Sequence, residues 1–227
     1  MIRFLGAFIA TITMVSAAAA PASQCYGSPG RGSLAQGVRL PIGGDNFGAY
    51  STVAVAAGRT YMHSTSAKIV IDTYARLASA LPLARFVYGE TGLQSGGPIA
   101  PHRTHQNGLS IDFFAPVRDA SGKAAVLPTQ MQSRFGYDIE FNTKGQYQQY
   151  QIDFPALAEH LYQLHGSAKQ NGAGIERVII DTAFLPQLFA TPRGPWLKAN
   201  LPFMMEKPWV RHDEHYHVDF SLPCRRP

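Results

Sequence analysis

The chain has 227 residues, of which 45% are apolar and 15% are charged, and its formal net charge is +5. These values are ordinary for a compact globular protein and exclude a disordered, fibrous or many-spanning membrane chain. Lysine and arginine are scattered rather than clustered, so we expect no nucleic-acid partner. The two cysteines, Cys25 and Cys224, are too few for a disulfide-built scaffold or a thiolate zinc site.

The first 22 residues have the pattern of a secretory signal peptide. A single charge, Arg3, is followed by an apolar stretch from Phe4 to Val15 and by small residues that end with Ala20-Pro21-Ala22. The apolar stretch is short for a hydrocarbon core of about 30 Å, so a stable membrane anchor is the weaker alternative. We therefore expect an exported, periplasmic protein whose mature domain spans residues 23–227.

Export would place the two cysteines in an oxidising compartment, where cysteines near opposite ends of a mature chain can pair. We expect a disulfide between Cys25 and Cys224 that closes nearly the whole domain. Two unpaired buried thiols are the alternative. Such a loop stabilises a fold by about 3–5 kcal/mol in the chain-entropy model.

The glycine-rich segment from Gly27 to Gly48 lacks periodicity, so we expect an irregular wrap at the N-terminus of the mature chain. Two helices are predicted after this segment. The first helix lies between Ser66 and Pro82. Its apolar residues recur at helical spacing: Val70, Tyr74, Leu77 and Leu81.

The second helix follows Asp153, which can cap it, and Pro155, which suits its first turn. Its apolar stripe consists of Leu157, Leu161 and Leu164, and Gly172 and Gly174 follow its end. His160 and His165 border this stripe, and we expect only packing or surface roles for them. The same expectation holds for His63, just before the first helix.

Four short runs are typical of β-strands. They are Arg85–Tyr88, Leu109–Phe114, Arg177–Asp181 and His215–Phe220. Together with the helices they predict an α+β fold, in which helices flank a central, mostly antiparallel sheet within one domain. No element is assigned to the polar, tyrosine-rich segment Asp138–Phe154.

Five of the eight histidines fall in two short stretches. The stretches are His102-Arg-Thr-His105 and His212-Asp-Glu-His215-Tyr-His217. Asp112 follows the first stretch inside an apolar run, where an unpaired carboxylate is costly and a nearby cation is favoured. Each of these features alone is weak evidence, and their conjunction indicates a metal site.

His215 and His217 are two residues apart in a predicted strand, so both side chains project from one face, with Cα atoms about 6–7 Å apart. Tyr216 between them then faces the core. Two such imidazoles, a carboxylate and a histidine from another element make a zinc site. Three protein ligands and a fourth position open to water are typical of catalytic zinc. The residues alone do not decide whether His215 or His217 is the ligand.

In order and spacing, these motifs resemble the penicillin-insensitive murein endopeptidases, which belong to the LAS metallopeptidases. The matching residues are Gly96-Gly97-Pro98, His102-x-x-His105-Gln106-x-Gly108-Leu109-x-x-Asp112 and His212-x-x-His215-x-His217. The resemblance covers most of the mature chain. It implies a small α+β domain of the LAS, DD-peptidase-like fold, a single zinc ion (Zn2+), and cleavage of peptide cross-links in peptidoglycan.

Carried over position by position, the resemblance implies that His105, Asp112 and His217 are the zinc ligands. His215 is then the catalytic histidine, and His212 and His102 are supporting groups beside the metal. Where the family usually has a second aspartate, two positions before the ligand Asp112, this chain has Ser110. We expect this difference to alter the hydrogen bonds around the ligands.

Zinc lowers the pKa of a bound water from about 15.7 to about 7, so hydroxide is available at neutral pH without a serine nucleophile. Penicillin acylates a serine nucleophile, and no Ser-x-x-Lys motif occurs in the chain. We expect His215 to assist either by proton transfer or by stabilising the tetrahedral oxyanion as an imidazolium.

Peptidoglycan stem peptides carry carboxylates, and Arg103 is the candidate cation that binds them, with a solvated loop residue as the alternative. Trp209 is expected to line the cleft. The leading hypothesis is a zinc endopeptidase that cuts D-Ala–diaminopimelate or similar cross-links. One alternative is a carboxypeptidase of the same fold, and another is a non-catalytic exported module that binds zinc or peptidoglycan. The sequence indicates no oligomeric state.

Overall fold

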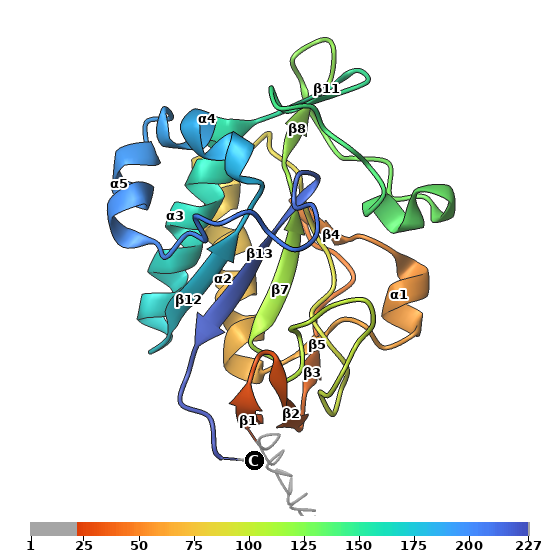
Figure 1. Cartoon of the computed structure of the whole chain (residues 1–227), viewed down its shortest axis with the longest axis vertical. Coiled ribbons are helices and arrows are strands. Elements are labelled where there is room, and N and C mark those ends of the chain that lie inside the picture. The colour runs from red at the N-terminus through yellow and green to blue at the C-terminus, as the bar shows by residue number, and fades with distance from the viewer. Residues whose placement is uncertain (1–21, 227) are drawn as a thin grey trace, which may run out of the picture.

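The computed structural model describes residues 22–226 (Figure 1). The predicted signal peptide therefore lies almost wholly outside the described residues. Within those residues, no helix combines the length and the apolar character needed to cross a membrane.

A mixed five-stranded sheet forms the centre of the fold. In spatial order its strands are β12 (Gly174–Ile179), β13 (His215–Ser221), β7 (Ser110–Phe114), β6 (Phe86–Tyr88) and β4 (Phe47–Ala49). The pairing of β4 with β6 is parallel, and the other three pairings are antiparallel. The expectation of a mostly antiparallel central sheet is thus confirmed, although β12 begins before the predicted run.

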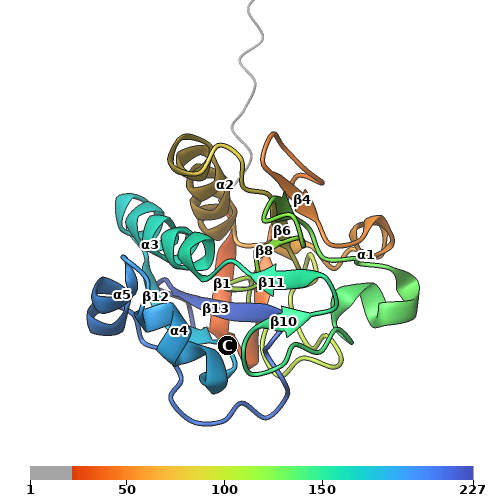
Figure 2. The ribbon, with the colours of Figure 1, turned by 90° about the horizontal axis from the view of Figure 1, so that it is seen from above.

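Helices α2 (Ser64–Ala80) and α3 (Phe154–Gln170) pack side by side against one face of the sheet (Figure 2). Both were predicted, and both begin at a side-chain cap. Asp153 Oδ1 accepts a hydrogen bond from the Ala156 amide at 3.1 Å, and His63 Nδ1 accepts one from the Thr65 amide at 3.1 Å. Capping by His63 is a structural role, as expected for this residue.

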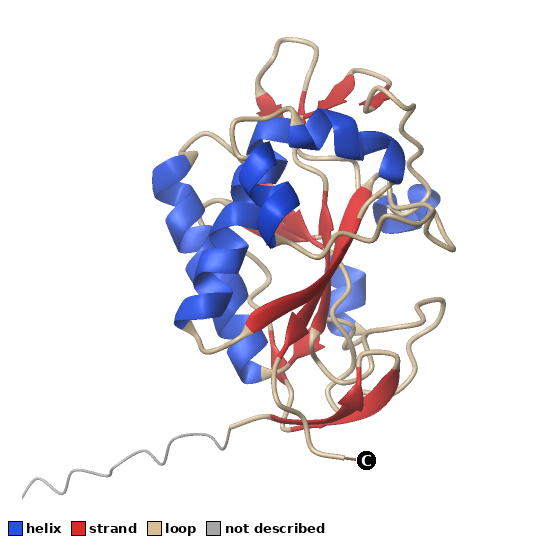
Figure 3. Ribbon diagram, turned by 60° about the vertical axis from the view of Figure 1, so that its left-hand side comes forward, coloured by secondary structure: helices blue, strands red, loops and turns tan. Residues whose placement is uncertain are grey.

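Shorter elements surround the central sheet and the two helices (Figure 3). The short helices are α1 (Thr52–Ala56), α4 (Leu185–Phe189) and α5 (Gly194–Asn200), with 3-10 turns η1 (Met131–Gly136) and η2 (Thr182–Phe184). A small sheet has the order β10 (Gln146–Tyr147), β11 (Tyr150–Ile152), β8 (Val117–Arg118) and β9 (Ala124–Ala125), and β3 (Val38–Arg39) pairs with β5 (Tyr61–Met62). The segment to which the sequence assigned no element thus contains β10 and β11.

The N-terminal segment is more regular than the predicted irregular wrap, and that prediction was wrong. Strands β1 (Gln24–Ser28) and β2 (Arg31–Ala35) form an antiparallel hairpin. Gly27 and Gly32 lie opposite each other in this hairpin. Because glycines have no side chains, they remove the polar and apolar alternation by which a strand is recognised in a sequence.

The predicted disulfide between Cys25 and Cys224 is confirmed, and it joins β1 to the C-terminal end of the chain. The hairpin in turn supports the long loop between β6 and β7. The Gln106 amide donates a hydrogen bond to the Pro29 carbonyl oxygen at 3.0 Å, and Asn107 Nδ2 lies 3.7 Å from Cys224 Sγ. The disulfide therefore fixes the hairpin beneath the loop that carries His102 and His105.

Tyr216 points to the face of the sheet that α2 and α3 cover, as predicted from its place between His215 and His217. Its side chain is buried, and its hydroxyl lies 2.7 Å from Nδ1 of His160 on α3. The two neighbouring histidines therefore face the opposite side of the sheet.

Burial lowers the pKa of His160 to about 3, so its ring is neutral in the folded protein. The unfolded chain titrates near 6.5, and above that pH both states are neutral. Below it only the unfolded state binds the proton, so stability falls as the pH falls from 6.5 towards 3. We expect His160 to contribute about 2 kcal/mol to the loss of unfolding free energy between pH 7.5 and pH 5.

Urea unfolding at these two pH values, with chelator present, tests this expectation. The variant His160→Gln keeps a hydrogen-bonding group but does not titrate, so its loss should be smaller than that of the wild type by about 2 kcal/mol. Other titrating groups are common to both proteins and cancel in the comparison. Equal losses would show that His160 does not titrate with the lowered pKa.

Candidate metal centre

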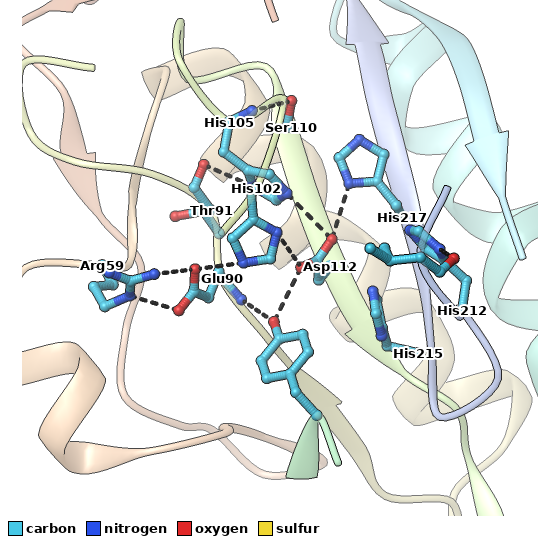
Figure 4. A network of polar contacts seen from close by, with 12 residues as sticks. Arg59, Glu90, Thr91, His102, His105, Ser110, Asp112, His212, His215 and His217 are labelled. Carbon is cyan, nitrogen blue, oxygen red and sulfur yellow. Dashed lines mark hydrogen bonds and ion pairs between the residues drawn. The ribbon is translucent and has the colours of Figure 1, made fainter. Parts of the chain in front are cut away.

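Asp112 lies within β7 and is surrounded by three imidazole rings (Figure 4). Its Oδ1 lies 2.9 Å from His217 Nδ1 and 3.3 Å from His105 Nε2. Its Oδ2 accepts a hydrogen bond from the Tyr137 hydroxyl at 3.0 Å and lies 3.8 Å from His102 Nδ1. The carboxylate is 1% exposed. The fold thus brings both histidine motifs together around one buried carboxylate.

The register of the sheet places His217 beside Asp112, because the two residues are direct partners in the pairing of β13 with β7. Directly opposed residues of paired strands carry their side chains on the same face. His105 comes from the loop before β7 and has a φ of 67°. This left-handed conformation is costly for a non-glycine residue and persists only where the surroundings hold it. A hydrogen bond of 3.1 Å from the His105 amide to Ser110 Oγ helps to hold His105 in this conformation.

His105 presents a lone pair to Asp112. Its Nδ1 lies 3.2 Å from the Thr91 carbonyl oxygen, which can only accept, so Nδ1 carries the proton of the neutral ring. Burial lowers the pKa of His105, which keeps the ring neutral. Its buried Nε2 has no hydrogen-bond partner among the described residues. Two electron-rich atoms, His105 Nε2 and Asp112 Oδ1, therefore face each other at 3.3 Å, an arrangement that a cation between them would stabilise.

His217 lies between two carboxylates. Its Nδ1 is 2.9 Å from Asp112 Oδ1 and its Nε2 is 2.8 Å from Asp219 Oδ1. Burial alone would lower the pKa of His217, but the carboxylates of Asp219 and Asp112 outweigh burial and raise the pKa to about 10. A proton on Nδ1 thus bridges His217 and Asp112 in the metal-free protein. Metal binding to such a ring displaces this proton.

The candidate ligand atoms fit a small divalent cation. Two ligands of a tetrahedral zinc ion, each at about 2.0–2.1 Å from the metal, are about 3.3 Å apart. The distances from Asp112 Oδ1 to His105 Nε2 and His217 Nδ1 are 3.3 and 2.9 Å, close to this value. His102 is also near, since single ligand atoms of His102, His105 and Asp112 all lie within 4.8 Å of one another. Imidazoles and one carboxylate are a donor set typical of zinc.

Glu90 is a buried residue of the site that sequence reasoning missed. Its Oε2 lies 2.8 Å from His102 Nε2, its Oε1 lies 2.5 Å from Arg59 Nε, and Oε1 also accepts from Tyr50 at 2.8 Å. Burial alone would raise the pKa of Glu90, but hydrogen bonds from His102 and Arg59 lower it to about 2. The charged carboxylate therefore holds the His102 ring by its Nε2. No motif around Glu90 marks it in the sequence.

His215 and His212 lie next to each other, with ring centroids 4.7 Å apart. His215 Nδ1 lies 2.7 Å from Glu214 Oε1, another buried carboxylate that the sequence reasoning missed. Burial alone would lower the pKa of His215, but Glu214 and Asp112 raise it. His212 donates from Nδ1 to the Val210 carbonyl oxygen at 2.9 Å, and burial with the nearby His215 lowers its pKa to about 3.

Asp219 and Ser110 connect the segments that carry His105 and His217. Ser110 Oγ donates to Asp219 Oδ1 at 2.6 Å and accepts from the His105 amide, while Asp219 Oδ1 also contacts His217. Carboxylates that bind the second nitrogen of a metal-ligating histidine fix its orientation. Asp219 lies two residues after His217, so the two-residue period of a strand could have identified it. Ser110, two positions before Asp112, is thus part of the network around the histidines.

A cleft of about 780 Å³ opens over the centre. His102, His212, His215 and His217 line it, whereas His105 and Asp112 are not among its lining residues. Its apolar lining comes from three segments and includes Val53, Ala54, Met131, Phe135, Trp209 and Val210. Trp209 lines the cleft, as expected, and Arg103 lines it too, with its guanidinium 5.5 Å from the Trp209 ring centroid.

Comparison with known protein families gives one match. Residues 25–227 match the family described as penicillin-insensitive murein endopeptidase. The matched range includes both cysteines of the disulfide and every residue of the centre described above. None of the curated proteins matches the chain.

Proposed function

The chain belongs to the penicillin-insensitive murein endopeptidase family, and we propose that it hydrolyses peptidoglycan cross-links with a zinc ion held by His105, Asp112 and His217. Family membership makes the protein a hydrolase and implies peptidoglycan as its substrate. The identity of the metal, the three ligands and the bond cut, D-Ala–diaminopimelate or a similar cross-link, are our proposal.

The observation that carries the metal proposal is the pair of atoms His105 Nε2 and Asp112 Oδ1. Both are buried, both offer lone pairs, and they face each other at 3.3 Å. A bound zinc ion supplies Lewis acidity, which lowers the pKa of water to about 7 and polarises a carbonyl group. His102 is the alternative third ligand, but its Nδ1 lies 3.8 Å from Asp112 Oδ2, whereas His217 Nδ1 lies 2.9 Å from Oδ1, the oxygen that also faces His105. We therefore propose His102 as a supporting group.

His215 is the proposed catalytic histidine. Glu214 binds its Nδ1, and the structure gives Nε2 no partner among the described residues, so Nε2 is free to exchange a proton in the cleft. The Glu214 carboxylate stabilises the protonated ring. His215 is thereby suited to accept a proton from the attacking water and to pass it to the leaving amine, or to stabilise the oxyanion as an imidazolium. His212, a neutral ring beside it, is the second supporting group.

Arg103 is the proposed binding group for a substrate carboxylate. Four arginines line the cleft: Arg59, Arg103, Arg134 and Arg211. Within residues 22–226, Arg103 has no ion pair, whereas each of the other three pairs with a carboxylate. Its charge is therefore available to a ligand, and the Trp209 ring keeps the guanidinium at the cleft.

We expect Arg103→Gln to raise KM for cross-linked muropeptides about two- to fivefold with little change in kcat, the effect of losing one exposed charge pair. Arg134→Gln is the matched control, since Arg134 lines the same cleft but pairs with Asp138 at 3.6 Å. Steady-state kinetics on native and amidated muropeptides measures KM and kcat for both variants. Equal KM increases on both substrates would rule out a carboxylate as the group that Arg103 binds.

We also propose that residues 1–22 direct export to the periplasm, that residues 23–227 form one metallopeptidase domain, and that this domain has the LAS, DD-peptidase-like fold. The Cys25–Cys224 disulfide supports export, since disulfides persist in oxidising compartments. Helices α2 and α3 cover one face of the central sheet (Figure 2), and the histidines of β13 project from the other face, which supports the fold assignment.

Digestion of purified cross-linked muropeptides, with and without chelator, tests the proposed function. The proposal predicts that dimers are converted to monomers, that chelator stops the reaction and that zinc restores it, with products identified by mass. Release of a single terminal residue from uncrosslinked stems would instead indicate a carboxypeptidase. Binding without any product would indicate a non-catalytic module.

A further inference from the structure

Tyr137, at the end of η1, lies beneath the centre with its hydroxyl held in a defined orientation. The Glu90 amide donates a hydrogen bond to the hydroxyl oxygen at 3.0 Å. The hydroxyl proton is therefore left for Asp112 Oδ2, also at 3.0 Å. Since an ionised carboxylate can only accept, the donor in this contact is Tyr137.

Because of this hydrogen bond, the two oxygens of Asp112 have different partners. Oδ2 accepts from Tyr137, whereas Oδ1 faces His105 Nε2 and His217 Nδ1 at 3.3 and 2.9 Å. Rotation of the carboxylate would break the bond to Tyr137. Asp112 is thereby held so that one oxygen alone points at the proposed metal position.

The Tyr137 ring is fixed by its neighbours. Its centroid lies 5.2 Å from the Phe114 ring, 5.7 Å from the Tyr50 ring and 5.0 Å from the His215 ring. Gly89 leaves room for the hydroxyl, because a Cβ at this position would lie 2.6 Å from the oxygen. The hydroxyl is thus positioned by packing before any metal binds.

We propose that Tyr137 is a positioning residue, which sets metal affinity by holding Asp112 as a single-oxygen ligand. This inference rests on the proposed function. Tyr137 directly follows η1, whose residues Met131, Arg134 and Phe135 line the cleft. The segment that forms one wall of the cleft therefore also orients a metal ligand. Loss of such an outer hydrogen bond to a ligand weakens metal binding by about 10- to 100-fold in other metalloproteins.

The test is the zinc dissociation constant of Tyr137→Phe, measured by competition with a chromophoric chelator on protein from which metal has been removed. We expect binding about 10- to 100-fold weaker than in the wild type. Tyr88→Phe is the matched control, because it removes another buried hydroxyl, which donates to the Pro41 carbonyl oxygen at 2.8 Å and does not contact the centre. Its zinc affinity should stay within about twofold of the wild type, although both variants lose unfolding free energy in chelator.

Zinc affinity in Tyr137→Phe within twofold of the wild type would overturn the inference, and so would equal weakening in both variants, since that would be a general effect of destabilisation. Failure of the wild type itself to bind zinc would overturn the proposed function, and the inference with it. The two failures are therefore distinguishable in one experiment.

Discussion

Asp112→Asn is expected to abolish stoichiometric metal binding and to lower kcat/KM by about 10³-fold or more, because a bound metal supplies several kcal/mol of transition-state stabilisation. The carboxylate lies between two proposed ligand rings and carries the charge that attracts the cation. An asparagine has the same shape but no charge, and its amide group would point a donor at the metal position or at Tyr137. Metal content by elemental analysis and turnover of muropeptide dimers measure the two effects.

Asp119→Asn is the matched control for this substitution. Asp119 is partly exposed, and its side chain accepts hydrogen bonds within the turn that joins β8 to β9. The same change of residue there should leave metal content and activity as in the wild type. If Asp112→Asn kept its metal and its activity, Asp112 would not be a ligand.

Replacement of His215 is expected to separate chemistry from metal binding. His215→Ala should keep its metal but lower kcat by about 10²–10⁴-fold, the contribution of a positioned acid–base group. His217→Ala should lose both metal and activity, because His217 Nδ1 faces Asp112 Oδ1. The two residues lie on the same strand and the same face of the sheet, so each variant is the control for the other. Equal metal content in both variants, with activity retained, would contradict the assigned roles.

Much of the scaffold of the site follows from local patterns. The apolar stripes and caps of α2 and α3 are encoded within single segments, and the structure contains both helices. The alternation along β13 places Tyr216 in the core and its two neighbouring histidines on the opposite face. These features depend on the period of one element and require no knowledge of how elements pack.

The groups around the histidines depend on tertiary contacts, and this is why the sequence did not reveal them. Glu90 and Tyr137 lie 47 positions apart in the chain and meet only because the loop after β6 and the end of η1 converge on Asp112. Glu214 adjoins His215, and its contact with Nδ1 depends on a rotamer rather than on a pattern. The hairpin of β1 and β2 was missed for another reason, since its paired glycines leave no side-chain alternation.

The candidate metal centre is held rigid by segments of different kinds. Asp112 and His217 come from paired strands, whose register fixes their separation. His105 comes from a loop, and this loop is held by the N-terminal hairpin and by the Cys25–Cys224 disulfide. Metal sites require such support, because ligands must be held close to the productive geometry before the metal arrives.

If two imidazoles and one carboxylate bind a single divalent metal, elemental analysis of freshly purified protein that has not been exposed to a chelator should find close to one zinc ion per chain. Asp112→Asn should show a proportionate loss of metal. Protein that is folded, oxidised at its disulfide and free of any stoichiometric transition metal would contradict this proposal.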